Sequence, residues 1–151
     1  MARLLVLVAA LAAATAAPND DVLILKPPTG KQGDPVAWIV LPGAQIDKST
    51  YQPLAEAVQK ESSQPLWVAV LGTYFTPSAV PPEVGPRIDA VLNEMKDQGL
   101  DLSKVKLFYG GHSLGSVFIQ DHLKSYHGST GPMGGKIEVL GQVLMGGFIQ
   151  R

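Results

Sequence analysis

The sequence contains no cysteine, and its 12 lysine and arginine residues are matched by 13 aspartate and glutamate residues. The absence of cysteine excludes disulfide bonds and zinc sites built on thiolates, so a hydrophobic core must stabilise the fold. The balanced charge argues against a nucleic-acid-binding protein, because such proteins usually carry a clustered basic excess. The three histidines are not at metal-ligand spacing with suitable carboxylates, so we expect no metal site.

Residues 1–17 have the composition of a secretory signal peptide. Arg3 supplies the only charge, an apolar run follows over residues 4–13, and small residues precede an expected cleavage site after Ala16. The run is shorter than the ~20 residues of a membrane-spanning helix, so a signal anchor is the weaker interpretation and no transmembrane segment is expected. We therefore predict a secreted protein, or one in the secretory-pathway lumen, with residues 18–151 forming the globular part.

Short apolar runs alternate with segments of helical periodicity in the globular part. The apolar runs predict strands at residues 22–25, 36–41, 66–71, 105–109 and 137–145. Helical spacing predicts helices that begin near Ser49, at Pro86 and at Leu114, the last one ending near His127. Strands that alternate with helices in this way are typical of βαβ units, so we predict an α/β fold with a mostly parallel sheet.

The start of the first helix has a capping signature. Ser49 followed by Gln52 fits a capping box, which predicts that the helix is capped at Ser49. The spacing of the following apolar residues predicts one buried helical face that contains Tyr51, Leu54, Ala55 and Val58.

The fourth predicted strand leads into the sequence Gly-Gly-His-Ser-Leu-Gly, and a helix follows. This segment fits the Gly-x-Ser-x-Gly nucleophile elbow, in which a strained strand-to-helix turn presents a serine. Gly111 and Gly115 would let neighbouring backbones pass without Cβ clashes. We predict Ser113 as the catalytic nucleophile and the backbone N–H of Leu114 as an oxyanion-hole donor. A tight turn whose serine merely caps the helix is the alternative.

On these residues the chain resembles the α/β-hydrolase superfamily, in which Gly-His-Ser-Leu-Gly is a lipase- and esterase-like elbow. The resemblance implies a three-layer fold with helices on both faces of the sheet and an acyl-enzyme mechanism on a small-molecule or lipid ester. It also implies a second oxyanion-hole donor in the loop after strand 36–41, at Ala44 or else at Gln45. An ordinary strand-ending turn at this place is the alternative. The loop at residues 72–85 would line an acyl pocket, form part of a lid or pack structurally.

The acid and the histidine that would complete a catalytic triad are not identified. The candidates after the nucleophile are Asp121, His122, His127 and Glu138. His122 lies nine residues along the predicted helix from Ser113, which is roughly 13 Å, and the expected reach of a general base is about 3 Å. Glu138 is expected at the opposite end of the sheet. His112 should point to the other face of its strand and is expected to be structural.

The resemblance also implies that the chain is short for the family's eight-stranded sheet. It ends just past what looks like the sixth of those strands, so we expect residues 18–151 to be the N-terminal part of an α/β-hydrolase-like domain. Two functions stay open: a secreted serine ester hydrolase or part of one, and a catalytically inactive module that binds a ligand or partner. The missing acid and histidine favour the inactive module for this chain alone, and the intact elbow favours the hydrolase for its lineage. The strand at residues 137–145 would leave a sheet edge exposed, through which the chain is expected to self-associate.

Overall fold

The computed structural model describes residues 21–72, 84–125, 131–147 and 149. The predicted signal peptide, residues 73–83 of the loop after the third strand, and His127 lie outside the described residues. Within the described ranges, the helices are all too short or too polar to cross a membrane.

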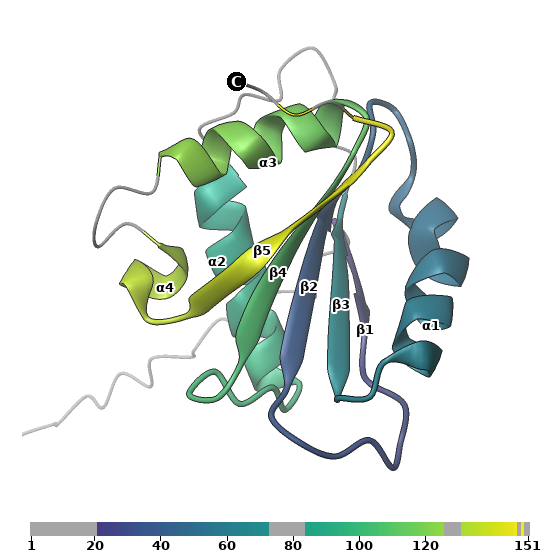
Figure 1. The fold of residues 1–151 in the computed structure, drawn as a ribbon, viewed down its shortest axis with the longest axis vertical. Helices are drawn as coiled ribbons and strands as arrows, with labels where there is room; N and C mark the ends of the chain where they lie inside the picture. Colours follow the sequence, from purple (N-terminus) through teal and green to yellow (C-terminus); the bar gives the residue numbers. More distant parts are fainter. Residues whose placement is uncertain (1–20, 73–83, 126–130, 148, 150–151) are drawn as a thin grey trace, which may run out of the picture.

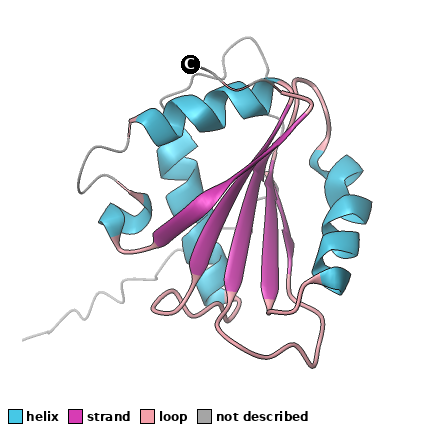
Figure 2. Ribbon diagram, in the orientation of Figure 1, coloured by secondary structure: helices cyan, strands magenta, loops and turns pink. Residues whose placement is uncertain are grey.

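A five-stranded sheet runs through the described residues (Figures 1 and 2). Its strands are β1 (Val22–Leu25), β2 (Val36–Leu41), β3 (Leu66–Leu71), β4 (Lys106–His112) and β5 (Glu138–Met145), and they lie in the order β1-β3-β2-β4-β5. Only β1 runs antiparallel to its neighbour, and the other three pairs are parallel. The predicted mostly parallel α/β sheet is confirmed.

Helices cover both faces of this sheet (Figure 1). One face is packed against α2 (Val84–Asp97) and α3 (Leu114–Lys124), and we call it the α2 face. The opposite α1 face is packed against the 3-10 turn η1 (Lys48–Tyr51) and α1 (Gln52–Glu61). Successive residues of a strand alternate between the faces, so that Ile39 joins the core under α2 and Trp38 the core under α1. The predicted three-layer arrangement is confirmed.

The two faces differ in how completely they are covered. On the α2 face, Ile88, Leu92 and Met95 of α2 are fully buried. On the α1 face, an open groove of about 710 Å³ runs between α1 and the neighbouring side of β4 and β5. The groove is lined by Val36, Trp38, Ala57, Val58, Glu61, Ser62, Gln64, Leu66, Phe108 and Val143.

The predicted capping box at the first helix is wrong. Asp47, not Ser49, caps the η1 turn: its Oδ1 accepts hydrogen bonds from the Ser49 N–H (2.8 Å) and the Ser49 hydroxyl (2.5 Å). Gln52, the other residue of the predicted box, instead donates to Glu56 along the helix. In a capping box the Ser49 hydroxyl would accept from the Gln52 N–H, but that N–H donates to the Ser49 carbonyl group instead. The Ser49 hydroxyl donates to the Asp47 carboxylate, because ionised acceptors form the stronger hydrogen bonds.

The predicted apolar face of α1 is only partly correct. Tyr51 and Ala55 are buried, whereas Leu54 and Val58 are 43% and 37% exposed. Of these two exposed residues, Val58 lines the open groove of the α1 face. Gln59 is buried instead, and its side-chain amide donates to three backbone carbonyl groups of the sheet and its connections.

Two further boundaries differ from the predictions. Strand β4 continues to His112, so the glycines before the nucleophile belong to the strand itself and not to a loop. A short helix, α4 (Pro132–Gly135), precedes β5, and the Met133 N–H ties it to α2 through a 2.8 Å hydrogen bond to Asp89.

Candidate active site

Ser113 forms the turn between β4 and α3. Its backbone has φ 51° and ψ −118°, a conformation that side-chain-bearing residues rarely adopt and that costs about 1–3 kcal/mol. The Ser113 N–H donates to the Met145 carbonyl group at 2.9 Å, and the Ser113 carbonyl group accepts from the Ser116 N–H at 3.0 Å. The serine is exposed at the first turn of α3. Contacts with β5 and with α3 therefore hold an exposed serine in a strained turn.

Both glycines of the motif lie where a side chain would collide with backbone. A Cβ at Gly111 would stand 2.6 Å from the Cα of Ser116, and one at Gly115 would overlap the carbonyl oxygens of Leu41 and Pro42. The first turn of α3 is thus packed between β4 and the end of β2.

The loop after β2 lies beside this turn. Its first residues, Pro42 and Gly43, are buried, and Ala44 and Gln45 are exposed. The Ile46 N–H closes the loop by donating to the Gly43 carbonyl group at 3.2 Å, and Gln45 adopts a positive φ of 59°. The structure therefore brings the segment that contains Ala44 to the end of the sheet where Leu114 and Ser113 lie. The assignment of Ala44 and Leu114 as oxyanion-hole donors stays a prediction.

His112 is turned to the α1 face, where it contacts a tyrosine. The Tyr51 hydroxyl lies 2.8 Å from His112 Nδ1 and accepts a 2.7 Å hydrogen bond from the Gly43 N–H. The two rings meet edge to face with their centroids 5.8 Å apart. Burial raises the pKa of the Tyr51 phenol, and the hydrogen bond from Gly43 opposes this only in part, so the hydroxyl keeps its proton at neutral pH.

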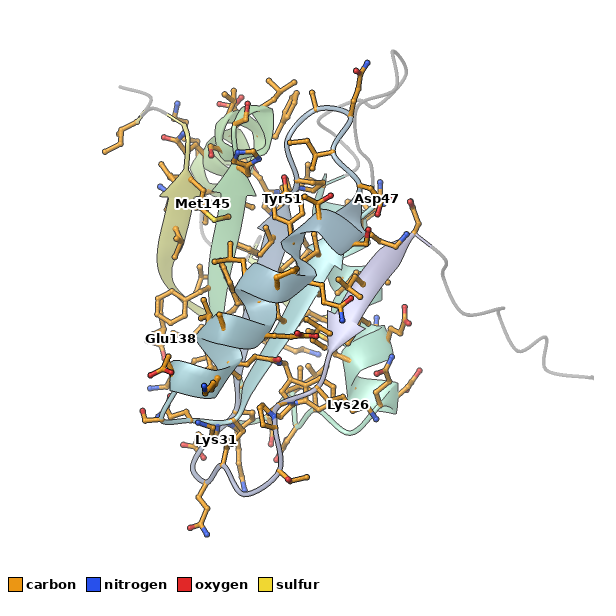
Figure 3. All side chains as sticks on the ribbon, turned by 90° about the vertical axis from the view of Figure 1, so that its right-hand side faces the viewer. Lys26, Lys31, Asp47, Tyr51, Glu138 and Met145 are labelled. Atoms are coloured by element: carbon orange, nitrogen blue, oxygen red, sulfur yellow. The ribbon has the colours of Figure 1, made fainter. Side chains whose placement is uncertain are left out.

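Sequence reasoning found His112 but missed its partner. Tyr51 was assigned only to the apolar face of the first helix, and 61 positions separate it from the histidine. No local pattern links two residues so far apart. Figure 3 shows Tyr51 and Met145 toward the same end of the sheet, with Glu138 toward the other end.

His122 packs on the α2 face, and Glu138 lies at the end of the sheet opposite Ser113, as expected from the sequence. The ring of His122 meets Tyr109 edge to face at 5.8 Å, on the α2 face. Burial lowers the pKa of His122, and the nearby charge of Asp89 opposes that shift. Glu138 begins β5 beside Lys106, at 3.9 Å. Across the ranges the structure describes, no group of three or more histidine, aspartate or glutamate side chains is placed to hold a metal ion.

Comparison with known proteins identifies structural neighbours and no sequence relatives. No family model and no curated protein matches the chain. A bacterial heroin esterase is similar with a TM-score of 0.51 at 18% identity, over 86% of this chain and 46% of the esterase. The siderophore hydrolase EstB from Aspergillus fumigatus is similar with a TM-score of 0.49 at 16% identity, over 83% of this chain and 39% of that protein.

The chain therefore spans less than half the length of these solved structures. At such low identity, the likeness to the heroin esterase shows a common fold and not a common activity. The fold shared with that structure is an α/β fold with a mostly parallel sheet.

Proposed function

We propose that this chain carries the nucleophile of a serine hydrolase that acts on carboxylic esters. The observation that carries the proposal is the backbone of Ser113, held at φ 51° between β4 and α3. A serine that only capped α3 would hydrogen-bond the first turn of the helix through its side chain. Ser113 makes no such side-chain bond, although it occupies the capping position. The strained turn is better explained by presentation of the hydroxyl to a substrate.

The reaction follows from the residues at this end of the sheet. The Ser113 hydroxyl oxygen attacks the ester carbonyl carbon while its proton passes to a base. The tetrahedral oxyanion accepts hydrogen bonds from the N–H groups of Leu114 and Ala44. Collapse of the intermediate breaks the ester C–O bond, the leaving oxygen takes the proton from the base and departs as the alcohol, and an acyl group stays on Ser113. Water then adds to the acyl-enzyme and releases the carboxylic acid, so the cycle requires no cofactor.

The base is not assigned to either histidine described. His112 contacts Tyr51 through Nδ1, and His122 packs against Tyr109 on the other face of the sheet. This placement favours a second candidate function, a hydrolase-like module that binds an ester or a protein partner without turning it over. The two candidates differ in whether the Ser113 hydroxyl is reactive.

Labelling with a fluorophosphonate probe separates these candidates. We expect the folded chain to be labelled at Ser113, with the adduct located by peptide mass spectrometry, and Ser113→Ala to abolish the label. Ser103→Ala is the matched control, because Ser103 is exposed and lies before β4. The Ser103→Ala variant should be labelled at Ser113 as strongly as the wild type. A folded wild-type chain that takes up no probe would contradict the hydrolase proposal and support the binding module.

Secretion and self-association are proposed as well. N-terminal sequencing of secreted protein should find a chain that begins at Ala17 or Pro18.

Strand β5 forms one edge of the sheet as described, and Val143 on it is 43% exposed. We expect copies to associate through this edge, which sedimentation velocity would detect as a concentration-dependent species. A single monomer boundary at all concentrations would contradict association.

A further inference from the structure

The contact between Tyr51 and His112 connects the two backbone segments beside the nucleophile. His112 immediately precedes Ser113, and Gly43 immediately precedes the predicted donor Ala44. The Tyr51 hydroxyl bonds to both: it accepts from the Gly43 N–H at 2.7 Å and lies 2.8 Å from His112 Nδ1. One buried oxygen atom therefore spans the gap between the loop after β2 and the elbow.

The hydrogen-bonding capacity of the phenol assigns the proton of the histidine ring. A phenol has one proton to donate, and the oxygen of this phenol already accepts a hydrogen bond from the Gly43 N–H. Tyr51 is only 8% exposed, so its own proton needs a protein acceptor, and His112 Nδ1 is at the right distance. Nδ1 then accepts, and the neutral imidazole carries its proton on Nε2.

Two glycine-containing segments flank the imidazole. A Cβ at Gly43 would stand 2.9 Å from His112 Nδ1, so this loop approaches the ring as closely as a glycine allows. On the other edge of the ring, a Cβ at Gly146 would lie 3.6 Å from Cδ2 and Nε2. The ring is thus enclosed between the loop after β2 and the end of β5.

We propose that the Tyr51 hydroxyl is a positioning group that sets the spacing between the loop after β2 and the elbow, by accepting the Gly43 N–H and donating to His112 Nδ1. This inference rests on the proposed function, in which Ala44 and Leu114 on these two segments bind one oxyanion. Donors to an oxyanion must be in place before charge develops, because reorganisation during the reaction would raise the barrier. Tyr51 touches no reacting atom and acts through its two neighbours.

Tyr51→Phe removes the hydroxyl and keeps the buried ring, and Tyr109→Phe is the matched control on the α2 face. In the wild-type chain, ¹⁵N NMR should show His112 with Nδ1 unprotonated and Nε2 protonated. In Tyr51→Phe this tautomer preference should be lost, and the Gly43 amide should exchange with solvent about tenfold faster. Labelling of Ser113 by the fluorophosphonate should slow by about tenfold. Tyr109→Phe should leave all three readouts unchanged.

A pair of substitutions at the histidine gives a second test. His112→Asn retains an acceptor near the position of Nδ1, and His112→Leu does not. We expect the rate of Ser113 labelling in His112→Asn to stay within about twofold of the wild-type rate. In His112→Leu the rate should fall as far as it does in Tyr51→Phe. Where the wild type is labelled, equal labelling rates in the His112→Asn and His112→Leu variants would overturn the assignment of Nδ1 as the acceptor.

The readouts also separate this inference from the proposed function. If the folded wild type takes no probe, the hydrolase proposal fails, and the His112 tautomer and Gly43 exchange still decide whether Tyr51 ties the two segments. If Ser113 is labelled but Tyr51→Phe changes neither the tautomer nor the exchange, the role of Tyr51 is overturned and the hydrolase proposal stands.

Discussion

The two faces of the sheet are built on the same strands but are packed to different degrees. On the α2 face the side chains of Leu92 and Met95 are fully buried. On the α1 face a groove of about 710 Å³ stays open beside α1, and Val143 at its rim is 43% exposed. Strand residues alternate between the faces, so the strands supply side chains to both. The difference in burial comes from the covering helices, because α2 and α3 pack on one face and only α1, with the η1 turn, packs on the other. Most of the packing that stabilises the fold therefore lies away from the Tyr51–His112 contact.

The largest expected difference in stability is between alanine substitutions of two leucines, one from each face. Leu92→Ala should lower the free energy of unfolding by about 3 kcal/mol, because the side chain is fully buried and its loss leaves a cavity. Leu54→Ala makes the same change on α1, where the side chain is 43% exposed, and should cost less than about 1 kcal/mol. Urea unfolding of both variants measures the difference. Equal losses would show that the α1 face is covered in solution.

Two glycines give the next contrast. Gly115→Ala should cost about 2 kcal/mol, because a Cβ there overlaps the carbonyl oxygens of Leu41 and Pro42. Gly141→Ala adds a Cβ at 3.8 Å from the Phe108 ring, an ordinary contact, and should stay within about 0.5 kcal/mol of the wild type. Thermal unfolding compares the pair. A well-tolerated Gly115→Ala would mean that the first turn of α3 can move away from β2.

The smallest predicted effect is a pH dependence that originates on the α2 face. Burial lowers the pKa of His122 below its ordinary value of 6.5, so the folded state binds fewer protons than the unfolded state in the range just below that value. Stability should therefore be full above about pH 6.5 and fall as the pH drops below it, by less than about 1.4 kcal/mol per pH unit.

His122→Phe removes this titration and keeps an aromatic ring against Tyr109. Its unfolding midpoint should change less between about pH 7.5 and pH 5.5 than that of the wild type. An identical pH profile in the variant would assign the acid sensitivity to another group.

The sequence predicted those parts of the fold that depend on local patterns. The apolar runs at residues 22–25, 36–41 and 66–71 coincide with β1, β2 and β3, because buried strands need continuous apolar residues whatever surrounds them. The glycine–serine–glycine spacing likewise indicated a strand-to-helix turn at Ser113, which is present. These features were predictable because each is decided within a few residues.

Features that depend on distant neighbours were missed. Periodicity placed Leu54 on a buried face, but burial depends on how far the helix covers the sheet, and here it covers only part. The antiparallel direction of β1 and the order of the strands follow from pairing across the chain, which no local pattern encodes. The Tyr51–His112 contact was missed for the same reason, and it is the main addition that the structure makes to the candidate site.

The hydrogen bond from the Ser113 N–H to the Met145 carbonyl group has a consequence for the order of events during synthesis. The ribosome delivers Ser113 well before Met145, so the nascent turn has no acceptor for this N–H until β5 has emerged and joined β4. Loss of β5 from the sheet would therefore also remove a hydrogen bond from the turn that presents Ser113.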